Sequence, residues 1–105
     1  MLALSNWAAN NADAFIAAID RNGIAAVYFA TRMVVAGGLI GLGVDVAWSF
    51  LQAGAYAGRI LNGADPGSLP VLSPRTELTV NLRTAAAQGI SIPVTLLAIA
   101  DTVTE

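Results

Sequence analysis

An apolar run from Ile24 to Phe29 constrains the fold of this chain more than any other feature. None of its residues is charged, and polar and apolar side chains do not alternate along it. A strand with one wet face shows such alternation, whereas a strand that is covered on both faces does not. The run lies between a predicted helix and a glycine-rich segment. We therefore expect a strand buried in a parallel sheet, with helices on both faces.

The predicted helix before this strand has recognisable ends. The pair Asn10-Asn11 is expected to supply the side chain that caps its first turn, and Asp13 lies where a negative charge favours the helix dipole. Gly23 supplies the left-handed residue that ends a helix. The apolar side chains on its inner face are Phe15, Ile16 and Ile19.

The middle of the chain predicts a helical turn, a strand and a long helix. The turn is expected within 30–36, and a second apolar run from Gly38 to Leu42 predicts a strand. Asp45 is expected to cap the longest helix, which ends near Asn62 and is stopped by Gly63. Apolar residues recur on this helix at spacings of three and four, which predicts a stripe that packs on a sheet: Val46, Phe50, Ala53, Ala57, Ile60 and Leu61.

The last third predicts one strand and two short helices. After a turn at 65–68, the segment from Thr76 to Leu82 alternates apolar and polar side chains and is therefore read as a strand. Asn81 can cap a short helix that Gly89 closes, and Pro93 is expected to begin the last helix. The expected order is helix, strand, turn, strand, helix, strand, helix, helix, which is an α/β fold in one unit over 1–105.

Composition excludes several classes of function. Apolar residues make up 56% and charged residues 11% of the chain, against about 45–50% and about 25% in average proteins. A net charge of −2 gives no basic patch for nucleic acid. The chain has no cysteine and no histidine, and its seven carboxylates are scattered. We therefore expect no enzyme, no metal site and no cofactor.

A membrane helix is the alternative that this composition allows. The window from Met33 to Leu51 carries only Asp45 as a charge and is long enough to cross a bilayer. Against this, Asp45 costs about 2.5–3.5 kcal/mol on insertion scales. The four glycines of the window also weaken a helix by roughly 1 kcal/mol each, so a soluble α/β protein is favoured.

The carboxyl-terminal half resembles the end of the solute-binding proteins of ABC transporters. In that family a helix ends R-I-L-x-G-A, a turn reads x-P-x-x-L-P-V, and E-L-x-x-N-L-x-T-A leads to a glycine and a proline. The matching residues are Arg59, Ile60, Leu61, Gly63, Ala64, Pro66, Leu69, Pro70, Val71, Glu77, Leu78, Asn81, Leu82, Thr84, Ala85, Gly89, Ile90, Ile92 and Pro93.

The resemblance extends upstream over the segment from Tyr28 to Ala47. Gly37, Gly38, Leu39, Gly43, Asp45 and Ala47 agree with the family pattern. Thr31 and Arg32 stand where the family has Arg-Glu, Gly41 and Leu42 where it has Ser-Tyr, and Val44 where it has Pro. These substitutions fall where ligand contacts are expected.

The resemblance implies a Rossmann-like, mostly parallel sheet, an incomplete piece of a type I bilobed periplasmic binding protein. In a complete receptor this region would span part of one lobe, a hinge passage and the elements that close the other lobe. The implied function is to bind a small solute between the lobes and to deliver it to an ABC permease. The implied location is periplasmic or otherwise extracytoplasmic.

The candidate ligand-binding residues each have a second interpretation. Tyr28 and Phe29 either stack on a solute or belong to the core. Arg32 either binds a carboxylate bidentately or lies on the surface. The backbone at Gly41, Leu42 and Gly43 either lines a cleft at the end of a strand or allows a strand to pack tightly on a helix. Asp45 is either a helix cap or a ligand contact.

A receptor fragment that acts only as an oligomeric interaction protein is the rival function. The segment from Met1 to Trp7 has no basic region and too short an apolar run for a signal peptide. If the chain is complete as given, we expect it in the cytoplasm. Its apolar composition then predicts a homo-oligomer or a partner that replaces the missing lobe.

Overall fold

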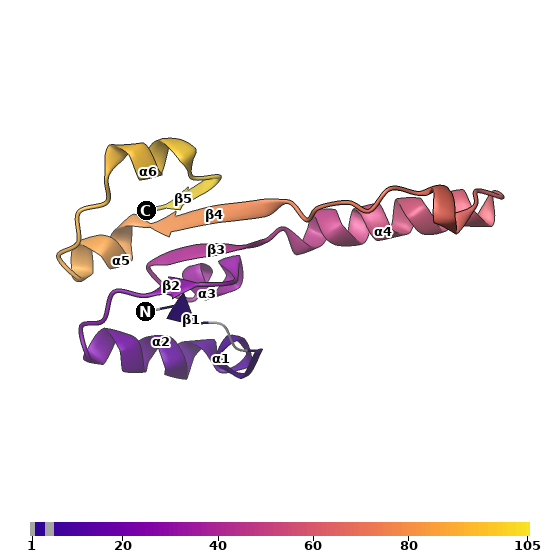
Figure 1. Ribbon diagram of the computed structural model, residues 1–105. Helices are drawn as coiled ribbons and strands as arrows, with labels where there is room; N and C mark the ends of the chain where they lie inside the picture. The colour runs from indigo at the N-terminus through magenta and orange to yellow at the C-terminus, as the bar shows by residue number, and fades with distance from the viewer. Residues whose placement is uncertain (1, 4–5) are drawn as a thin grey trace. The chain divides into compact units, whose positions relative to one another are not determined.

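The computed structural model describes residues 2–3 and 6–105, which form an α/β fold (Figure 1). Met1, Leu4 and Ser5, which belong to the segment considered for a signal peptide, lie outside the described residues. The elements are β1 (Leu2–Ala3), α1 (Asn6–Asn10), α2 (Ala12–Arg21), β2 (Val27–Tyr28), α3 (Thr31–Val35), β3 (Ile40–Val44), α4 (Val46–Leu61), the short 3₁₀ helix η1 (Pro66–Ser68), β4 (Thr76–Asn81), α5 (Leu82–Ala87), α6 (Val94–Ile99) and β5 (Thr102–Thr104).

The chain divides into two compact units. The first, which we call the sheet unit, combines residues 1–43 with residues 77–105, and the second, the hairpin unit, is 44–76. The terminal elements α5, α6 and β5 therefore return to the unit that holds α2 and β2. The expectation that they close a different lobe is wrong, because β4 pairs with β3 and brings the chain back. That residues 1–105 act as one domain stays a prediction.

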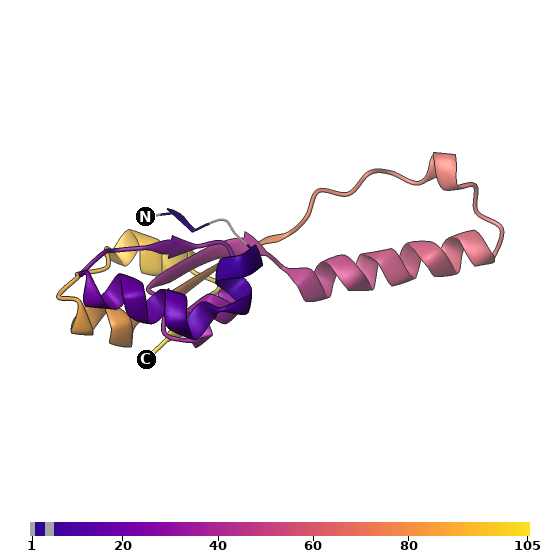
Figure 2. The same cartoon turned by 90° about the horizontal axis from the view of Figure 1, so that it is seen from below.

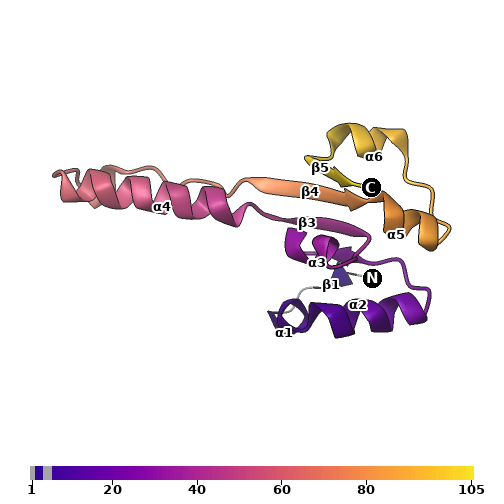
Figure 3. The same ribbon diagram turned by 180° about the vertical axis from the view of Figure 1, so that it is seen from behind.

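The described strands form one sheet in the order β1-β2-β3-β4-β5. β1 pairs with β2, β2 with β3, and β4 with β5 in parallel. β4 runs against β3, as the arrows show (Figure 3), and the Asn81 N–H donates to the Leu39 carbonyl at 2.9 Å. Three of the four pairings are parallel, so the predicted mostly parallel sheet is confirmed. The carboxyl ends of β2 and β3 consequently lie at one end of the sheet and those of β4 and β5 at the other.

The core of the sheet unit forms around β2. Ile16 and Ile19 of α2 pack with Ala26, Tyr28 and Met33 in one cluster. The predicted strand over 24–29 is shorter in the structure, because only Val27–Tyr28 pairs with its neighbours. Ala26 and Tyr28 are buried while Val27 and Phe29 are half-buried. Burial on both faces is thus wrong for the beginning of the run, where Ile24 is exposed.

The two ends of α2 differ in how well the sequence describes them. Gly23 has φ +62, and the Ile24 N–H donates to the Ile19 carbonyl at 3.2 Å, so the left-handed stop is confirmed. Asn11 occupies the cap position but makes no side-chain cap. Its side chain instead donates to the Trp7 carbonyl at 2.9 Å. The reason is that α1 leads almost directly into α2, so the Asn11 side chain bonds to a carbonyl of α1 and not to the free N–H groups of the first turn of α2.

The helix ends of the hairpin unit follow the predictions. Asp45 Oδ1 accepts from the Trp48 N–H at 2.9 Å, which confirms the cap of α4. Gly63 has φ +97 just beyond the helix. The chain after η1 then runs back along α4 (Figure 2), and the Tyr56 hydroxyl donates to the Pro70 carbonyl.

The apolar stripe of α4 is not covered within the hairpin unit, and its packing on a sheet stays a prediction. No residue of α4 is buried. The half-buried side chains include Trp48, Gln52 and Tyr56, whereas Phe50 and Leu61 are exposed. The returning chain is held at Tyr56, which lies outside the predicted stripe.

The apolar window from Met33 to Leu51 is not a single helix. It divides between α3, β3 and the start of α4. Within the described residues, no helix has the length and apolar character needed to span a bilayer.

The elements from β4 to β5 follow the predicted helix cap but are buried differently from the prediction. Asn81 Oδ1 accepts from the Thr84 N–H at 3.0 Å, so the predicted cap of α5 is confirmed, and Gly89 has φ +67 after it. Thr79, Val80 and Asn81 are all buried, because β4 lies between β3 and β5. The alternation of apolar and polar side chains along β4 therefore does not mark a solvent-exposed face. β5 itself was not predicted.

Candidate functional site

The predicted site begins in the core, at Tyr28. This side chain is only 1% exposed and forms part of the cluster around β2. Gly38 lies against its ring, since a Cβ atom there would come within 2.7 Å of Tyr28 Cε2. Burial raises the pKa of the Tyr28 hydroxyl, and the nearby charge of Asp20 raises it further. The structure shows Tyr28 as a core residue, and a ligand contact by Tyr28 stays a prediction.

Two glycines of β3 allow close packing. A Cβ atom at Gly41 would come within 2.6 Å of Val34 Cγ2 on α3, and one at Gly43 would overlap the Phe29 carbonyl oxygen. Real Cβ atoms do not approach other atoms so closely, so both positions require glycine. Between them, Leu42 is 54% exposed. The tight-packing interpretation thus applies to both glycines, and contact with a solute at Leu42 stays a prediction.

The other two predicted site residues, Arg32 and Asp45, lie outside β2 and β3. Arg32 lies on α3, where its side chain is exposed and makes no ion pair with any residue that the structure describes. Asp45 belongs to the hairpin unit and caps α4. The structure therefore places Tyr28, Phe29, Gly41, Leu42 and Gly43 on or directly after β2 and β3, with Arg32 on the helix that follows β2.

A polar pair at the same end of the sheet was not predicted. The Thr31 hydroxyl donates to Glu77 Oε2 at 3.2 Å, and both residues are half-buried. Glu77 lies at the start of β4, which runs against β3 and so begins where β3 ends. Glu77 appeared in the sequence only as a motif residue, because its partner lies 46 residues away. The pair places a carboxylate next to the predicted site.

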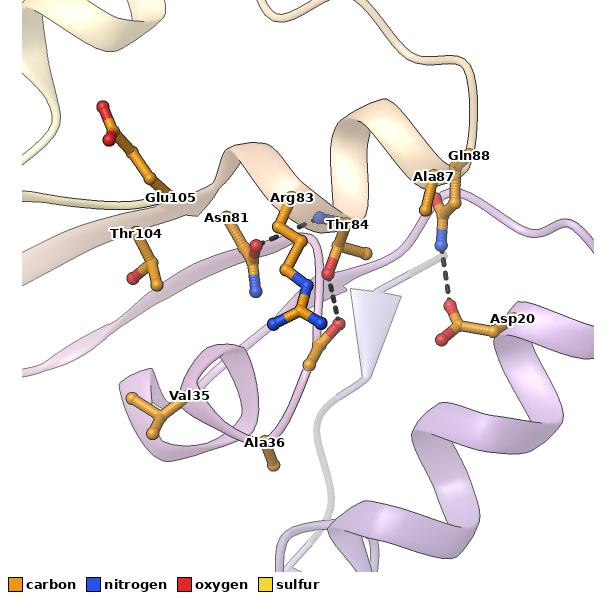
Figure 4. A pocket seen from close by; sticks show the side chains of 11 residues that line it. Asp20, Val35, Ala36, Asn81, Arg83, Thr84, Ala87, Gln88, Thr104 and Glu105 are labelled. Carbon is orange, nitrogen blue, oxygen red and sulfur yellow. Dashed lines mark hydrogen bonds between the residues drawn. The ribbon is translucent and has the colours of Figure 1, made fainter.

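A pocket of about 450 Å³ lies at the opposite end of the sheet (Figure 4). It is lined by the carboxyl ends of β4 and β5, by α5, and by the last residues of α2 and α3. Its lining residues are Asp20, Val35, Ala36, Gly37, Asn81, Arg83, Thr84, Ala87, Gln88, Thr104 and Glu105. None of the predicted ligand-binding residues lines it.

The pocket's polar groups hold the two chain segments of the sheet unit together. Gln88 Nε2 donates to Asp20 Oδ1 at 2.7 Å, and Thr84 Oγ1 donates to the Gly37 carbonyl at 2.8 Å. Figure 4 shows Arg83 extending from α5 toward α3 beside the Thr84–Gly37 bond. Most of the pocket's polar side chains thus serve the structure of the unit.

Solved structures of other proteins contain the same arrangement of elements. A conserved domain protein of Vibrio cholerae matches 98% of this chain with 31% identity and a TM-score of 0.82. The ABC domain of Streptococcus pneumoniae, solved in complex with L-Trp, matches 95% with 26% identity and a TM-score of 0.79. CD0873, a ligand-free substrate binding protein of Clostridium difficile, matches 95% with 23% identity and a TM-score of 0.67, which shows the fold alone.

The matches cover only part of each solved protein. The chain spans about a third of their length, namely 35% of the Vibrio cholerae chain, 35% of the Streptococcus pneumoniae chain and 34% of the Clostridium difficile chain. A comparison with curated protein sequences finds no match. The family model of the ABC transporter substrate binding proteins, in contrast, matches residues 4–104. The chain, with its mostly parallel sheet and flanking helices, belongs to the family of ABC transporter substrate binding proteins.

Proposed function

We propose that this chain supplies part of the solute-binding cleft of a receptor that serves an ABC uptake transporter. The observation that carries this proposal is the family match over residues 4–104. The L-Trp that the Streptococcus pneumoniae structure contains supports a small-molecule solute. A role in binding rather than catalysis agrees with the absence of histidine and cysteine from the sequence.

The proposed contribution to the cleft is the end of the sheet where β2 and β3 terminate. Ligands of open α/β sheets bind outside the carboxyl ends of the strands. Exposed Leu42 lies near the end of β3, and the Thr31–Glu77 pair lies at the same end of the sheet. Arg32 follows β2 on α3, where its exposed guanidinium makes no ion pair with the described residues. An arginine of this kind binds a carboxylate with two parallel hydrogen bonds. The proposed solute is therefore a small molecule that carries a carboxylate.

The proposed receptor needs further protein to complete the cleft. A pocket for a small molecule buries most of its ligand between walls, and the solved relatives are about three times as long as this chain. The proposed partners are the remaining part of such a receptor and an ABC permease. The proposed location is extracytoplasmic, as is typical of this family.

A chimera tests this function. This chain replaces the matching third of the Streptococcus pneumoniae protein, and calorimetry measures binding of amino acids and other small carboxylates. We expect saturable binding that Arg32→Gln weakens about tenfold or more, because hydrogen bonds to charged groups contribute about 1.5–3 kcal/mol. Arg21→Gln, an exposed arginine of α2, is the control.

Two results would overturn the proposal. A chimera that folds but binds no solute would favour the rival, an oligomeric interaction protein without ligand. Equal weakening by Arg32→Gln and Arg21→Gln would remove Arg32 from the site.

A further inference from the structure

The sequence Asn-Gly occurs twice in this chain, at residues 22–23 and at residues 62–63. Both pairs follow a helix, since Asn22 ends α2 and Asn62 ends α4. Their backbones are closely alike, with φ −94 and ψ 3 at Asn22, φ −87 and ψ 11 at Asn62, and positive φ at both glycines. Each glycine N–H donates to the carbonyl three residues before it at 3.0 Å. The two pairs are therefore matched in backbone geometry and differ in their surroundings.

An asparagine that precedes glycine can lose ammonia by reaction with its own backbone. The glycine nitrogen passes its proton to solvent and attacks the carbonyl carbon of the asparagine side chain. A C–N bond forms and closes a succinimide ring, while Nδ2 takes up a proton and leaves as ammonia. Water then opens the ring at either carbonyl and yields aspartate or isoaspartate. Glycine permits the attack because it has no Cβ atom and a wide range of φ and ψ, but its N–H must first leave its hydrogen bond.

The surroundings of Asn22 oppose this reaction. Its Nδ2 donates to the Ala18 carbonyl at 2.7 Å, which holds the side chain back along α2. Asp20, whose carbonyl accepts the glycine N–H, is itself held by Gln88 Nε2 at 2.7 Å (Figure 4). Ile19 in the same turn belongs to the core of the sheet unit. The end of α2 is thus restrained by hydrogen bonds and by packing, all within the sheet unit.

The surroundings of Asn62 within the hairpin unit contain no such restraint. Its side chain is exposed and makes no hydrogen bond with any residue that the structure describes. The last turn of α4, from Gly58 to Leu61, likewise makes no side-chain hydrogen bond to another described element. No atom lies within 4 Å of a Cβ atom placed on Gly63. When the end of α4 frays, the side chain of Asn62 is free to turn toward the Gly63 nitrogen.

We infer that Asn62 is a site of spontaneous deamidation, which becomes aspartate or isoaspartate while Asn22 keeps its amide. The new carboxylate lies at the carboxyl end of α4, where the helix dipole disfavours negative charge. In isoaspartate the main chain also gains a methylene group, so the left-handed helix end at Gly63 loses its geometry. The inference goes beyond the proposed function and rests on no solute.

Peptide mapping by mass spectrometry tests the inference, with Asn22 as the control inside the same molecule. Trypsin separates the two sites, because cleavage after arginine yields the peptides 22–32 and 60–75. The chain is incubated at mildly alkaline pH, and the fraction of each peptide that has exchanged its amide for a carboxyl group is followed with time. We expect the peptide 60–75 to change at least about tenfold faster than 22–32, because the bonds that hold Asn22 must open first.

Two further preparations separate the effect of the fold from that of the sequence. In denaturing urea both peptides should change at similar rates, since the two sites share the Asn-Gly sequence. Gln88→Ala releases Asp20 and should raise the rate at Asn22 while the rate at Asn62 stays the same. Circular dichroism establishes that each native sample is folded. If the isolated chain is unfolded, the same two peptides are measured in the folded Streptococcus pneumoniae chimera.

Two outcomes would overturn the inference. Equal rates for the two peptides in the folded protein would show that the bonds around Asn22 give it no protection. A peptide 60–75 that stays unchanged in the folded protein but reacts in urea would show that the hydrogen bond of the Gly63 N–H blocks the reaction by itself. Neither outcome depends on solute binding, so this test and that of the proposed function fail independently.

Discussion

The hydroxyl of Thr84 donates a 2.8 Å hydrogen bond to the carbonyl of Gly37, which lies 47 residues earlier in the chain. This bond joins α5 to the end of α3 and so connects the two chain segments of the sheet unit. Gln88 and Asp20 make a second connection, across 68 residues. The sheet unit is therefore complete only after the chain has passed through the hairpin unit and returned.

Replacing Thr84 by Val should lower the free energy of unfolding by about 1 kcal/mol, because it leaves the Gly37 carbonyl without its side-chain donor. Thr84→Ser keeps the hydroxyl and should retain most of the stability. Thr95→Val, at an exposed position of α6, is the control. Urea denaturation measures all three, and equal midpoints for Thr84→Val and Thr95→Val would show that the bond contributes nothing.

Replacing Gly43 by Ala should destabilise the chain by about 1–3 kcal/mol, because the new Cβ overlaps the Phe29 carbonyl oxygen. The matched variant is Gly54→Ala in α4, where no atom lies within 4 Å of the new Cβ. It should stabilise the chain by up to about 1 kcal/mol through helix propensity. Opposite signs in thermal denaturation are expected, and a neutral Gly43→Ala would contradict the close approach of β3 to Phe29.

Replacing Gly63 by Val should cost more than about 1 kcal/mol, since Gly63 has φ +97 and a β-branched residue is disfavoured there. Space does not limit this position, because nothing lies within 4 Å of a Cβ atom. Gly63→Asn should therefore cost less than Gly63→Val. Denaturation midpoints compare the variants, and equal values for Asn and Val would show that backbone strain does not govern this helix end.

Stability should fall at alkaline pH because burial, aided by the charge of Asp20, raises the pKa of Tyr28 above 10.0. The unfolded chain then releases the tyrosine proton at lower pH than the folded chain. Tyr28 contributes stability that is fully present below about pH 10 and is lost as the pH rises through its folded pKa.

Denaturation at a series of pH values from about 9 to about 12 measures this loss. The chain has no lysine or cysteine to titrate in this range and only two tyrosines. Tyr28→Phe should flatten the profile. An unchanged profile in Tyr28→Phe would assign the alkaline loss to other groups.

The sequence predicted those features that depend on neighbouring residues. Asp45 and Asn81 cap the helices that follow them, and Gly23 and Gly63 end helices with positive φ. Each of these features is decided within about four residues. Asn11 is the exception, because α1 lies directly before it and changes its partner.

Features that depend on distant parts of the chain were missed. The shortened β2, the buried end of β4 and the unpredicted β5 all follow from strand pairing between remote segments. Periodicity identifies the apolar face of α4 but not its partner, so the packing of this face on a sheet stays a prediction. In the candidate site, the sequence identified the residues on and directly after β2 and β3. It did not place Glu77 next to them or reveal the pocket at the other end of the sheet, because both depend on the fold.

Calorimetry on the isolated chain and on the Streptococcus pneumoniae chimera tests the central claim, that this chain forms part of a receptor cleft completed by further protein. We expect no binding of amino acids or small carboxylates at micromolar concentration by the 105-residue chain, and saturable binding by the folded chimera. Micromolar binding by the chain alone, or a folded chimera without binding, would contradict it.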